Sequence, residues 1–532
     1  MSRAQRYPRL ILALVCLPVF IGALDLTIVS AVLPDVIRSM SIEIQRLDLA
    51  GWVVTGYFIA YAVSMTFMGR VSDLGGRRFV YLLCLAIFFA GSWLVAASPG
   101  WPARLVASLI PATSDADLAP LYALIAGRVV QAFGAGAMVP VSMALVADLF
   151  PPEKRAVPLG VVGAIDTAGW VLGHLYGGIM VQFVSWPFLF WVNLPIVFVM
   201  FWITWWGLAD LPRPAVKGGI DWVGVTLLGA ALTLLNVGLG APELGVESTA
   251  APPHRTAWVV GAAVAFGLFL VSQARVRHPL LDLRIFSNRN LASASGVNLL
   301  VGFCIMVALV SVPLFINVAG GADSTTAALV TGYLLCAFTV PMALAAVPGG
   351  WLALRVGYRW SVLLGLVVAV SGFWMMSQWQ TDMAGVVVAL LDGASGAPAS
   401  AVSDVAFMAA GLLLAGVGIG LTMAPVSTAV INGVREGDRG MASSLVIILR
   451  LIGMSIGMSS MTSYALRRTP VISQQMLRPE DALDLEKTAR VALEVVTRIT
   501  SEIALIALAV AVVAAAVALL LRRGDRVADA PG

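Results

Sequence analysis

Five ionisable side chains lie inside long apolar stretches of the sequence: Asp25, Arg128, Asp166, His174 and Arg450. An ionisable group at the centre of a bilayer costs at least about 2.5–3.5 kcal/mol, so it needs a polar partner or a water-filled cavity. The chemistry open to such groups is the binding and transfer of protons.

Asp25 lies near the middle of the first apolar run, 10–33. Removal from water disfavours the charged form of a carboxyl, so Asp25 could exchange a proton near physiological pH. We interpret it as a proton-coupling carboxylate or as the counter-ion of a cationic substrate. The alternative is a permanently protonated acid that only hydrogen-bonds a neighbouring helix.

The two arginines keep their charge, so each must be satisfied by a carboxylate or by several carbonyls. Arg128 lies early in the run 119–149, where structural pairing with another helix and modulation of a proton site are both open. Arg450 is the only charge deep in the later runs. We interpret it as a functional group and as the natural partner of an acid from the first half.

Asp166 and His174 lie in one run, 158–183, eight residues and so about two helical turns apart. On one inward face, a carboxylate and an imidazole could relay protons. The alternative is that His174 only donates to a carbonyl of the next helix.

Small residues recur in the same run. They let a partner helix approach closely, either as plain packing or as a sliding contact. These glycines are Gly163, Gly169, Gly173, Gly177 and Gly178.

No enzyme constellation stands out in the sequence: there is no Walker loop, no metal-ligand spacing and no large soluble segment to carry catalytic groups. We therefore predict a chain that is not an enzyme, with no catalytic residue, no metal and no cofactor, and with a proton gradient as its energy source. All four cysteines fall inside apolar runs, which favours helical burial over disulfides. They are Cys16, Cys84, Cys304 and Cys336.

The composition of the chain predicts the structural elements that hold these ionisable residues. Of 532 residues, 60% are hydrophobic and 12% charged, and the mean hydropathy is +0.93. A soluble domain carries about 25% charged residues, so the solvent of this chain is the bilayer. Fourteen apolar runs are long enough to span it: 10–33, 49–69, 79–98, 119–149, 158–183, 187–208, 221–241, 256–274, 291–318, 326–348, 359–379, 404–427, 441–466 and 499–521.

An even number of spans puts both termini on one side. Of the 33 Lys and Arg residues, 21 then fall on the side of the termini, ten on the other side, and two within spans. By the positive-inside rule both termini are cytoplasmic. The first run continues past the length of a signal peptide and has no cleavage site after it, so we predict a retained membrane helix.

The chain also repeats itself. Gly69 and Gly76 follow the second run, and Gly350 and Gly357 follow the second run of the later half, with a basic residue close behind each pair. Internal symmetry of this kind is typical of secondary transporters. We predict an N-terminal six-helix bundle over 1–208, two extra linker helices within 209–290, and a C-terminal six-helix bundle over 291–532.

Two segments on the outer side stand out. Residues 380–403 are rich in Gly, Ala and Ser around an apolar run, which favours a hairpin. Residues 467–498 mix Arg, Glu, Asp and Leu at helical spacing, which favours continuation of the last two helices beyond the membrane. A solvated loop is the alternative for 467–498.

Six stretches form motifs whose order along the chain is specific: Leu24–Val29, Ala31–Pro34, Gly69–Arg78, Arg128–Gly134, Ser185–Pro195 and His278–Leu283. Through them the chain resembles the major facilitator superfamily, specifically its fourteen-span drug:proton antiporter branch, over nearly its whole length. The resemblance implies an all-α integral membrane protein with two six-helix bundles plus two extra helices. It also implies a cytoplasmic gate motif formed by Gly69, Asp73, Gly76 and Arg77, with Asp25 taking the proton and Arg128 assisting.

The helix-5 signature of that branch has Gly-Pro where this chain has Gly173-His174. The later half is similar to a narrower group, the mycobacterial exporters linked to triacylglycerol and lipoprotein trafficking and to drug resistance. The similar stretches are Gly349–Gly357, Phe373–Trp379 and Arg450–Met454. In that group a helix-5 carboxylate would align at Thr167, one residue and about 100° of helix away from Asp166.

The prediction is a proton-coupled secondary exporter of lipids or lipophilic, cationic amphiphiles in the bacterial inner membrane, working by alternating access. The alternatives are a multidrug:proton antiporter without a lipid role and a transport-inactive membrane scaffold. Expected partners are the bilayer, a lipid or lipophilic small-molecule substrate and a periplasmic lipid-carrier protein. We expect a monomer, and no nucleic acid as partner.

Overall fold

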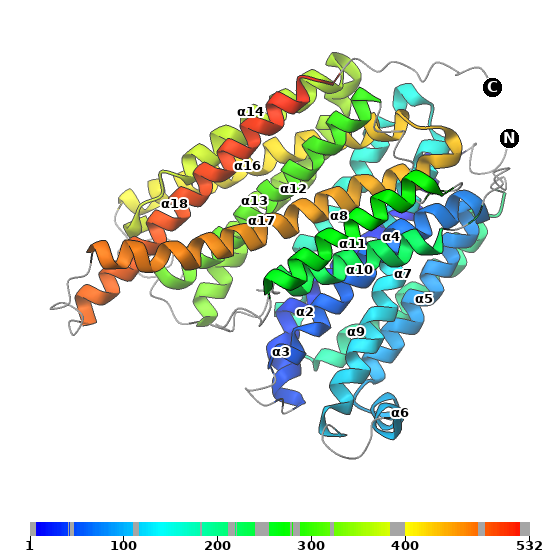
Figure 1. Cartoon of the computed structure of the whole chain (residues 1–532), viewed down its shortest axis with the longest axis horizontal. Coiled ribbons are helices and arrows are strands. Elements are labelled where there is room, and N and C mark those ends of the chain that lie inside the picture. The colour runs from blue at the N-terminus through cyan, green and yellow to red at the C-terminus, as the bar shows by residue number, and fades with distance from the viewer. Residues whose placement is uncertain are drawn as a thin grey trace. The chain divides into compact units, whose positions relative to one another are not determined.

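The structure of the chain is a computed structural model that describes residues 7–40, 42, 47–109, 116–180, 183–210, 219, 221–239, 255–276, 279, 288–319, 324–383, 399–476 and 485–521. Within these ranges every regular element is a helix and no strand occurs (Figure 1). A helix satisfies its backbone hydrogen bonds locally, which is what a chain in hydrocarbon requires. The predicted all-α membrane fold is confirmed.

Contacts divide the chain into two compact units. Unit 1 holds the described residues up to Leu291 together with Val430–Ile448, and unit 2 holds those of Ala292–Ala429 and of the chain from Leu449 onward. The three-part division at 208 and 290 stays a prediction, and the segment 430–448 belongs by its contacts to unit 1.

In unit 1 the structure describes ten α-helices over their whole length: α2 (Pro8–Ser39), α3 (Leu47–Ala50), α4 (Trp52–Gly75), α5 (Arg77–Ala97), α6 (Trp101–Leu109), α7 (Ala119–Leu149), α8 (Ala156–Met180), α9 (Trp186–Gly207), α10 (Trp222–Leu239) and α11 (Arg255–Arg275). Three short 3-10 helices complete this unit: η2 (Ala116–Leu118), η3 (Pro152–Lys154) and η6 (Glu436–Asp438). The principal packing partners are α2 with α8, α5 and α4 with α7, and α10 with α11.

Unit 2 is built from α12 (Arg289–Ala319), α13 (Ser324–Val356), α14 (Tyr358–Met376), α16 (Ala399–Asn432), α17 (Arg439–Met476) and α18 (Leu485–Ala518). The first turns of α12 and α17 and the last of α16 fall in unit 1. Within unit 2, α14 packs along α18 (Figure 1).

Twelve helices of the described chain are long and apolar enough to cross a membrane. The remaining two of the fourteen predicted spans correspond to α8 and α10, whose described apolar segments, Ala156–Trp170 and Trp222–Leu235, are shorter. The multi-pass membrane architecture is therefore established, and the count of fourteen stays a prediction.

The predicted internal repeat has a backbone signature. Gly76 joins α4 to α5 with a φ of 95°, and Gly357 joins α13 to α14 with a φ of 88°. They are the only glycines in the described chain with positive φ. A side chain would be strained there, so each turn needs a glycine. In each turn the glycine N–H donates to the carbonyl four residues earlier, Ser72 in one case and Ala353 in the other.

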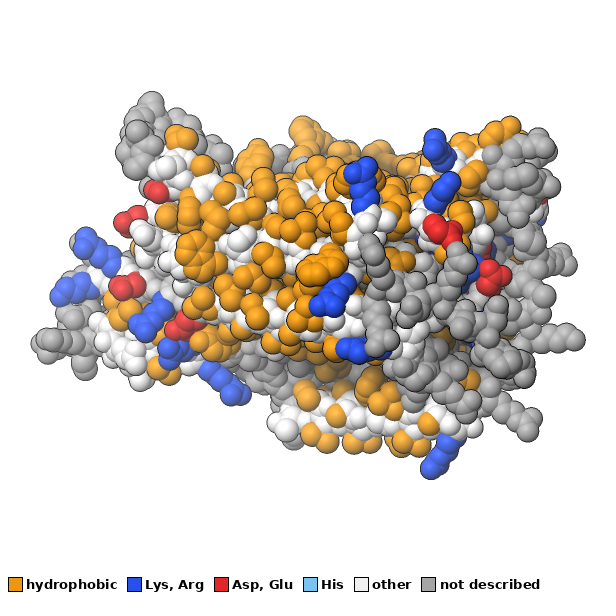
Figure 2. All heavy atoms as spheres, turned by 90° about the horizontal axis from the view of Figure 1, so that it is seen from above, with side chains coloured by type: hydrophobic (Ala, Val, Ile, Leu, Met, Phe, Trp, Pro, Cys, Tyr) orange, Lys and Arg blue, Asp and Glu red, His pale blue; other side chains and the backbone are white. Residues whose placement is uncertain are grey.

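The surface of the helices is apolar, as a lipid-facing surface must be. Figure 2 shows hydrophobic side chains covering much of the described surface on the face in view. On α9, exposed aromatic side chains lie on the outward face, among them Trp202, Trp205 and Trp206. In a soluble protein such a patch would mark a binding surface, and here it is the surface offered to lipid.

The last two helices are unusually long. α17 has 38 residues and α18 has 34, so helical structure continues through most of 467–498, as the helical spacing predicts and the solvated-loop alternative does not. Arg468 donates to both carboxylate oxygens of Glu502, from Nε at 3.0 Å and from Nη2 at 2.9 Å, and so ties α17 to α18. This hydrogen bonding raises the pKa of Arg468. Residues 477–484 lie outside the described residues, as does most of the expected hairpin at 380–403.

Candidate functional site

A buried ion pair joins α2 to α7. Arg128 Nη1 donates to Asp25 Oδ2 at 2.6 Å, and Arg128 Nη2 donates to the Asp25 carbonyl oxygen at 3.3 Å. Asp25 is 0% exposed and Arg128 is 1% exposed. Two of the predicted proton-coupling residues therefore lie together, and the structure assigns Arg128 the partner that the sequence left open.

Three neutral polar side chains extend the pair. The Gln131 amide donates from Nε2 to Asp25 Oδ1 at 3.0 Å and to Ser92 Oγ at 2.9 Å, and its Oε1 accepts from Arg128 at 2.7 Å. Asn193 Nδ2 on α9 donates to Asp25 Oδ1 at 3.2 Å. The network, hereafter the Asp25 network, draws side chains from α2, α5, α7 and α9.

Aromatic rings cover the guanidinium. The Arg128 carbon Cζ lies 3.8 Å from the centre of the Tyr57 ring on α4 and 5.8 Å from that of Phe190 on α9. A cation over an aromatic face gains roughly 0.5–2 kcal/mol, more where water is excluded. Arg128 thus keeps an attractive partner whatever the charge of Asp25.

Glycines bring the helices of the network close enough for these bonds. A Cβ at Gly91 on α5 would collide with the backbone of Gln131, and one at Gly136 on α7 would collide with the Tyr61 carbonyl on α4. The short side chains of the network therefore meet because these helices touch backbone to backbone.

The predicted glycine stripe on α8 is a contact with α2. A Cβ at Gly169 would lie 2.6 Å from the Phe20 carbonyl oxygen, and one at Gly173 would overlap Thr27 Oγ1 and the Leu24 carbonyl. Thr27 Oγ1 also donates to the Trp170 carbonyl at 2.8 Å. Gly163 is different, since nothing lies within 4 Å of its Cβ position. Gly177 is buried, and the surroundings of Gly178 lie outside the described residues.

The predicted relay of Asp166 and His174 stays a prediction. Asp166 is 2% exposed on α8. Thr167 beside it donates to the Gly163 carbonyl of its own helix at 2.9 Å. The side chain of His174 lies outside what the structure describes, so its part in a relay stays a prediction.

Arg450 is buried in unit 2, on α17. Its backbone touches α12, because a Cβ at Gly302 would meet the Arg450 carbonyl. Asp25 and Arg128 belong to unit 1. The expected pairing of Arg450 with an acid of the first half stays a prediction.

The predicted gate motif forms a second charged cluster in unit 1. Asp73 accepts from Arg77 Nη1 at 2.6 Å and from the backbone N–H groups of Gly440 and Met441 at 2.9 and 3.1 Å. Those amides are the second and third residues of α17, so the carboxylate lies at a helix N-terminus, where the helix dipole favours an anion. A Cβ at Gly69 would meet Ser444 Oγ and the Gly440 carbonyl, so Gly69 lets α4 touch α17.

Asp148 at the end of α7 links two arginines of this cluster. Its Oδ2 accepts from Arg77 Nε at 3.1 Å, and its Oδ1 accepts from Arg439 Nη1 at 2.8 Å. Arg439 also reaches Glu436 at 2.9 Å. Beside the cluster, burial and the nearby Arg439 charge lower the pKa of Arg155 to about 10, and Arg155 Nη1 donates to Asn432 Oδ1 at 2.8 Å.

Sequence reasoning missed several members of both clusters. Ser92, Tyr57, Asp148 and Arg439 carried no signal beyond a polar or aromatic residue in or near an apolar run. Gln131 and Asn193 stand in the motifs that carry the resemblance, and this was their signal in the sequence.

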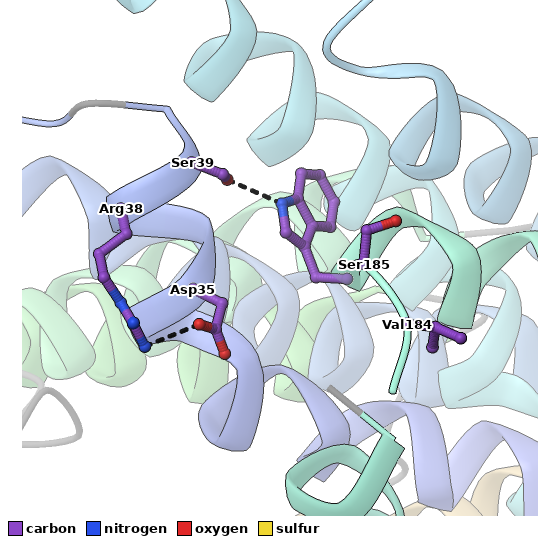
Figure 3. A pocket seen from close by; sticks show the side chains of 6 residues that line it. Asp35, Arg38, Ser39, Val184 and Ser185 are labelled. Atoms are coloured by element: carbon purple, nitrogen blue, oxygen red, sulfur yellow. Dashed lines mark hydrogen bonds and ion pairs between the residues drawn. The ribbon is translucent and has the colours of Figure 1, made fainter. Parts of the chain in front are cut away.

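A shallow depression of about 360 Å³ lies where α2 ends and α9 begins (Figure 3). Trp186 Nε1 donates to Ser39 Oγ at 2.9 Å, and Arg38 pairs with Asp35 at 2.7 Å (Figure 3). Within the described residues no group of three His, Cys, Asp or Glu could hold a metal ion. The four cysteines are free thiols, three of them buried.

Many membrane-crossing helices, an internal repeat and a buried charge network define a polytopic membrane transporter. The chain matches the sequence profile of the Major Facilitator Superfamily over residues 15–458, and it belongs to that family. The family is one of transporters, so this chain is a transporter and not an enzyme.

Mycobacterial proteins are similar to this chain over most of its length. The chain is 31% identical to a probable triacylglyceride transporter of Mycobacterium leprae over 521 residues, which cover 97% of this chain and 96% of that one. It is 33% identical to a triacylglyceride transporter of Mycobacterium tuberculosis, with 85% and 82% of the chains covered. The sequence-based resemblance to this group is confirmed.

Solved structures agree on the fold. The human organic anion transporter MFSD10 superposes with a TM-score of 0.56 at 15% identity, covering 94% of this chain and 99% of that one. The proton:xylose symporter XylE superposes with a TM-score of 0.53 at 12% identity, covering 94% of both chains.

Proposed function

We propose that this transporter is a proton-coupled exporter of lipids or lipophilic amphiphiles that works by alternating access. Asp25 binds and releases the coupling proton, and Arg128 assists by pairing with the carboxylate when the proton is absent. The energy source is the proton gradient, and no cofactor takes part.

The observation that carries the coupling proposal is the Asp25 network. A carboxylate without water in a membrane protein is costly unless it is paired. Replacing such a pair by apolar residues is often neutral or stabilising, so packing alone gives no reason to bury it. Burial of the pair is explained if the Asp25 carboxyl must alternate between a charged state paired with Arg128 and a neutral, protonated state.

The proposed substrate class, lipids or lipophilic amphiphiles, is based on the names of the mycobacterial relatives. Those in Mycobacterium leprae and Mycobacterium tuberculosis carry the name triacylglyceride transporter. Lipid or lipophilic solutes suit an apolar chain, because apolar contacts accept many shapes. The long outer helices α17 and α18 are then part of the route, with a periplasmic lipid-carrier protein as the receiving partner.

The orientation follows from charge. Cytoplasmic termini and a location in the bacterial inner membrane agree with the positive-inside rule. The Asp73 cluster, on the same side as the termini, then acts as a cytoplasmic gate that holds α17 to α4 and α5. We propose a monomer as the working unit.

The experiment is reconstitution of the full chain in proteoliposomes with an imposed pH gradient. A fluorescent acylglycerol and an ethidium-type cation are followed side by side, with Asp25→Asn as the control. Acylglycerol movement that needs both the gradient and Asp25 is the expected result.

Each other outcome points to a different function. Gradient-driven dye movement without lipid movement would make the chain a multidrug:proton antiporter, which the first-half motifs favour. Lipid movement without a gradient would refute the coupling. No movement of either solute, with a stoichiometric partner retained in purification, would indicate a transport-inactive scaffold.

A further inference from the structure

The side chain of Asp25 is surrounded by hydrogen-bond donors. Oδ2 accepts from Arg128, and Oδ1 accepts from the amide nitrogens of Gln131 and Asn193. A carboxylate is an acceptor only, so this arrangement fits the charged form. A protonated carboxyl must donate its hydrogen, and each of these three groups presents hydrogens to it.

When the proton binds, an acceptor must therefore face the carboxyl, and one of these three groups can supply it only by turning. Arg128 cannot serve, because a guanidinium has no acceptor atom. Gln131 is held at both ends, with Oε1 accepting from Arg128 and Nε2 donating to Ser92. Turning its amide would set an NH₂ group against the guanidinium.

Asn193 is held by one bond. Among the described residues its side chain makes a single hydrogen bond, to Asp25 Oδ1, and at 3.2 Å this is the longest of the three bonds to the carboxylate oxygens. The terminal torsion of an asparagine has a broad, roughly two-fold profile. A half turn would exchange Nδ2 for Oδ1 without moving α9.

We propose that Asn193 is a positioning residue that serves both protonation states of Asp25: its NH₂ donates to the carboxylate, and after a half turn its carbonyl accepts from the carboxyl O–H. This rests on the proposed function in one respect, namely that Asp25 takes up a proton. The amide exchange makes proton binding possible without opening the whole network.

The charged and titratable groups near Asp25 come from the helices packed around it. From α7 the facing group is Arg128, and from α4 it is the Tyr57 phenol, whose ring lies under the guanidinium and whose hydroxyl, near Asp25, can accept as well as donate. α9 contributes neutral side chains, and α8, which packs along α2, carries the buried acid Asp166 in the same unit.

The test is infrared difference spectroscopy of the full chain in lipid, between high and low pH, with asparagine-selective ¹³C labelling. Acidification should produce a carboxyl C=O band that is absent in Asp25→Asn. The same step should shift a ¹³C-sensitive amide band that Asn193→Leu removes. In Asn193→Leu the carboxyl band should move to higher wavenumber, because the O–H has lost its acceptor.

Two further variants make the result decisive. Asn193→Thr introduces a hydroxyl that both donates and accepts, and should keep the carboxyl band near its wild-type position. If Asn193→Leu leaves the band in place while Gln131→Leu or Tyr57→Phe moves it, that other residue is the acceptor and the proposal is wrong. If the wild-type difference spectrum has no carboxyl band that Asp25→Asn removes, Asp25 does not take up a proton and the proposed function itself is refuted.

Discussion

Arg128 Nη1 lies 2.6 Å from Asp25 Oδ2, although 103 positions of sequence separate the two residues. Both side chains are buried and neither faces bulk solvent. The guanidinium cannot be neutralised, so the carboxyl is the member of the pair that can change its charge. This asymmetry sets the expected behaviour of the variants below.

Asp25→Asn should abolish gradient-driven transport and leave a folded protein. The amide keeps the volume and an acceptor for Arg128 but cannot bind the proton. Loss of the countercharge should cost up to about 3–5 kcal/mol, which lowers the melting temperature. Transport in proteoliposomes and a melting curve of the purified variant check both parts. Wild-type transport by a folded variant would exclude Asp25 from coupling.

Gly173→Ala should damage the contact of α8 with α2. The added Cβ would overlap the Leu24 carbonyl, so the helices must separate. We expect about 1–3 kcal/mol of destabilisation, with a loss of transport. Gly163→Ala is the matched control on the same helix, since its Cβ meets nothing within 4 Å. Equal melting temperatures for the two variants would contradict the packing described.

Asp73→Asn should weaken the attachment of α17 to α4. The carboxylate is buried and accepts from Arg77 and from two amides at the start of α17. We expect about 3–5 kcal/mol of destabilisation, because Arg77 loses a buried partner. The Glu436→Gln control should change stability by no more than about 1 kcal/mol, since that side chain is 85% exposed. A large loss of stability in Glu436→Gln would contradict the expectation that a buried ion pair contributes more to stability than an exposed one.

Arg450→Ala should inactivate transport without loss of expression. A buried arginine in the membrane costs too much to be retained for packing. Arg467→Ala, an exposed position on the same helix, is the control and should transport normally. Both variants are compared at matched protein density in the proteoliposome assay. A normal rate for Arg450→Ala would remove this residue from the mechanism.

The membrane class, the helical fold and the charged residues inside apolar runs could be predicted from the sequence. Asp25 and Arg128 could be found because a charge inside an apolar run is conspicuous. Asn193 and Ser92 could not be ranked from the residues alone, because a neutral polar side chain in a membrane helix carries little cost. Which helices pack against each other depends on the tertiary structure. The partner of Arg128 therefore could not be identified from the sequence alone.

The gate motif was predictable in part. Gly76 and Arg77 stood out by spacing, but Asp148 and Arg439 lie far from them in sequence and come together only because α17 returns to unit 1. Helical continuation into 467–498 followed from side-chain periodicity, which is a local property and therefore visible in the sequence.

The two glycine turns differ in what surrounds them. Asp73 precedes Gly76 by three residues and is 1% exposed, whereas Leu354 precedes Gly357 by three residues and is 43% exposed. Arg77 follows the first glycine, and Tyr358 follows the second. Both turns have the glycine bend, and of the two only the first has a buried carboxylate three residues before its glycine. Backbone shape and charge pairing are thus separable: the second turn has a basic residue, Arg359, close behind its glycine, but the exposed Leu354 offers it no carboxylate.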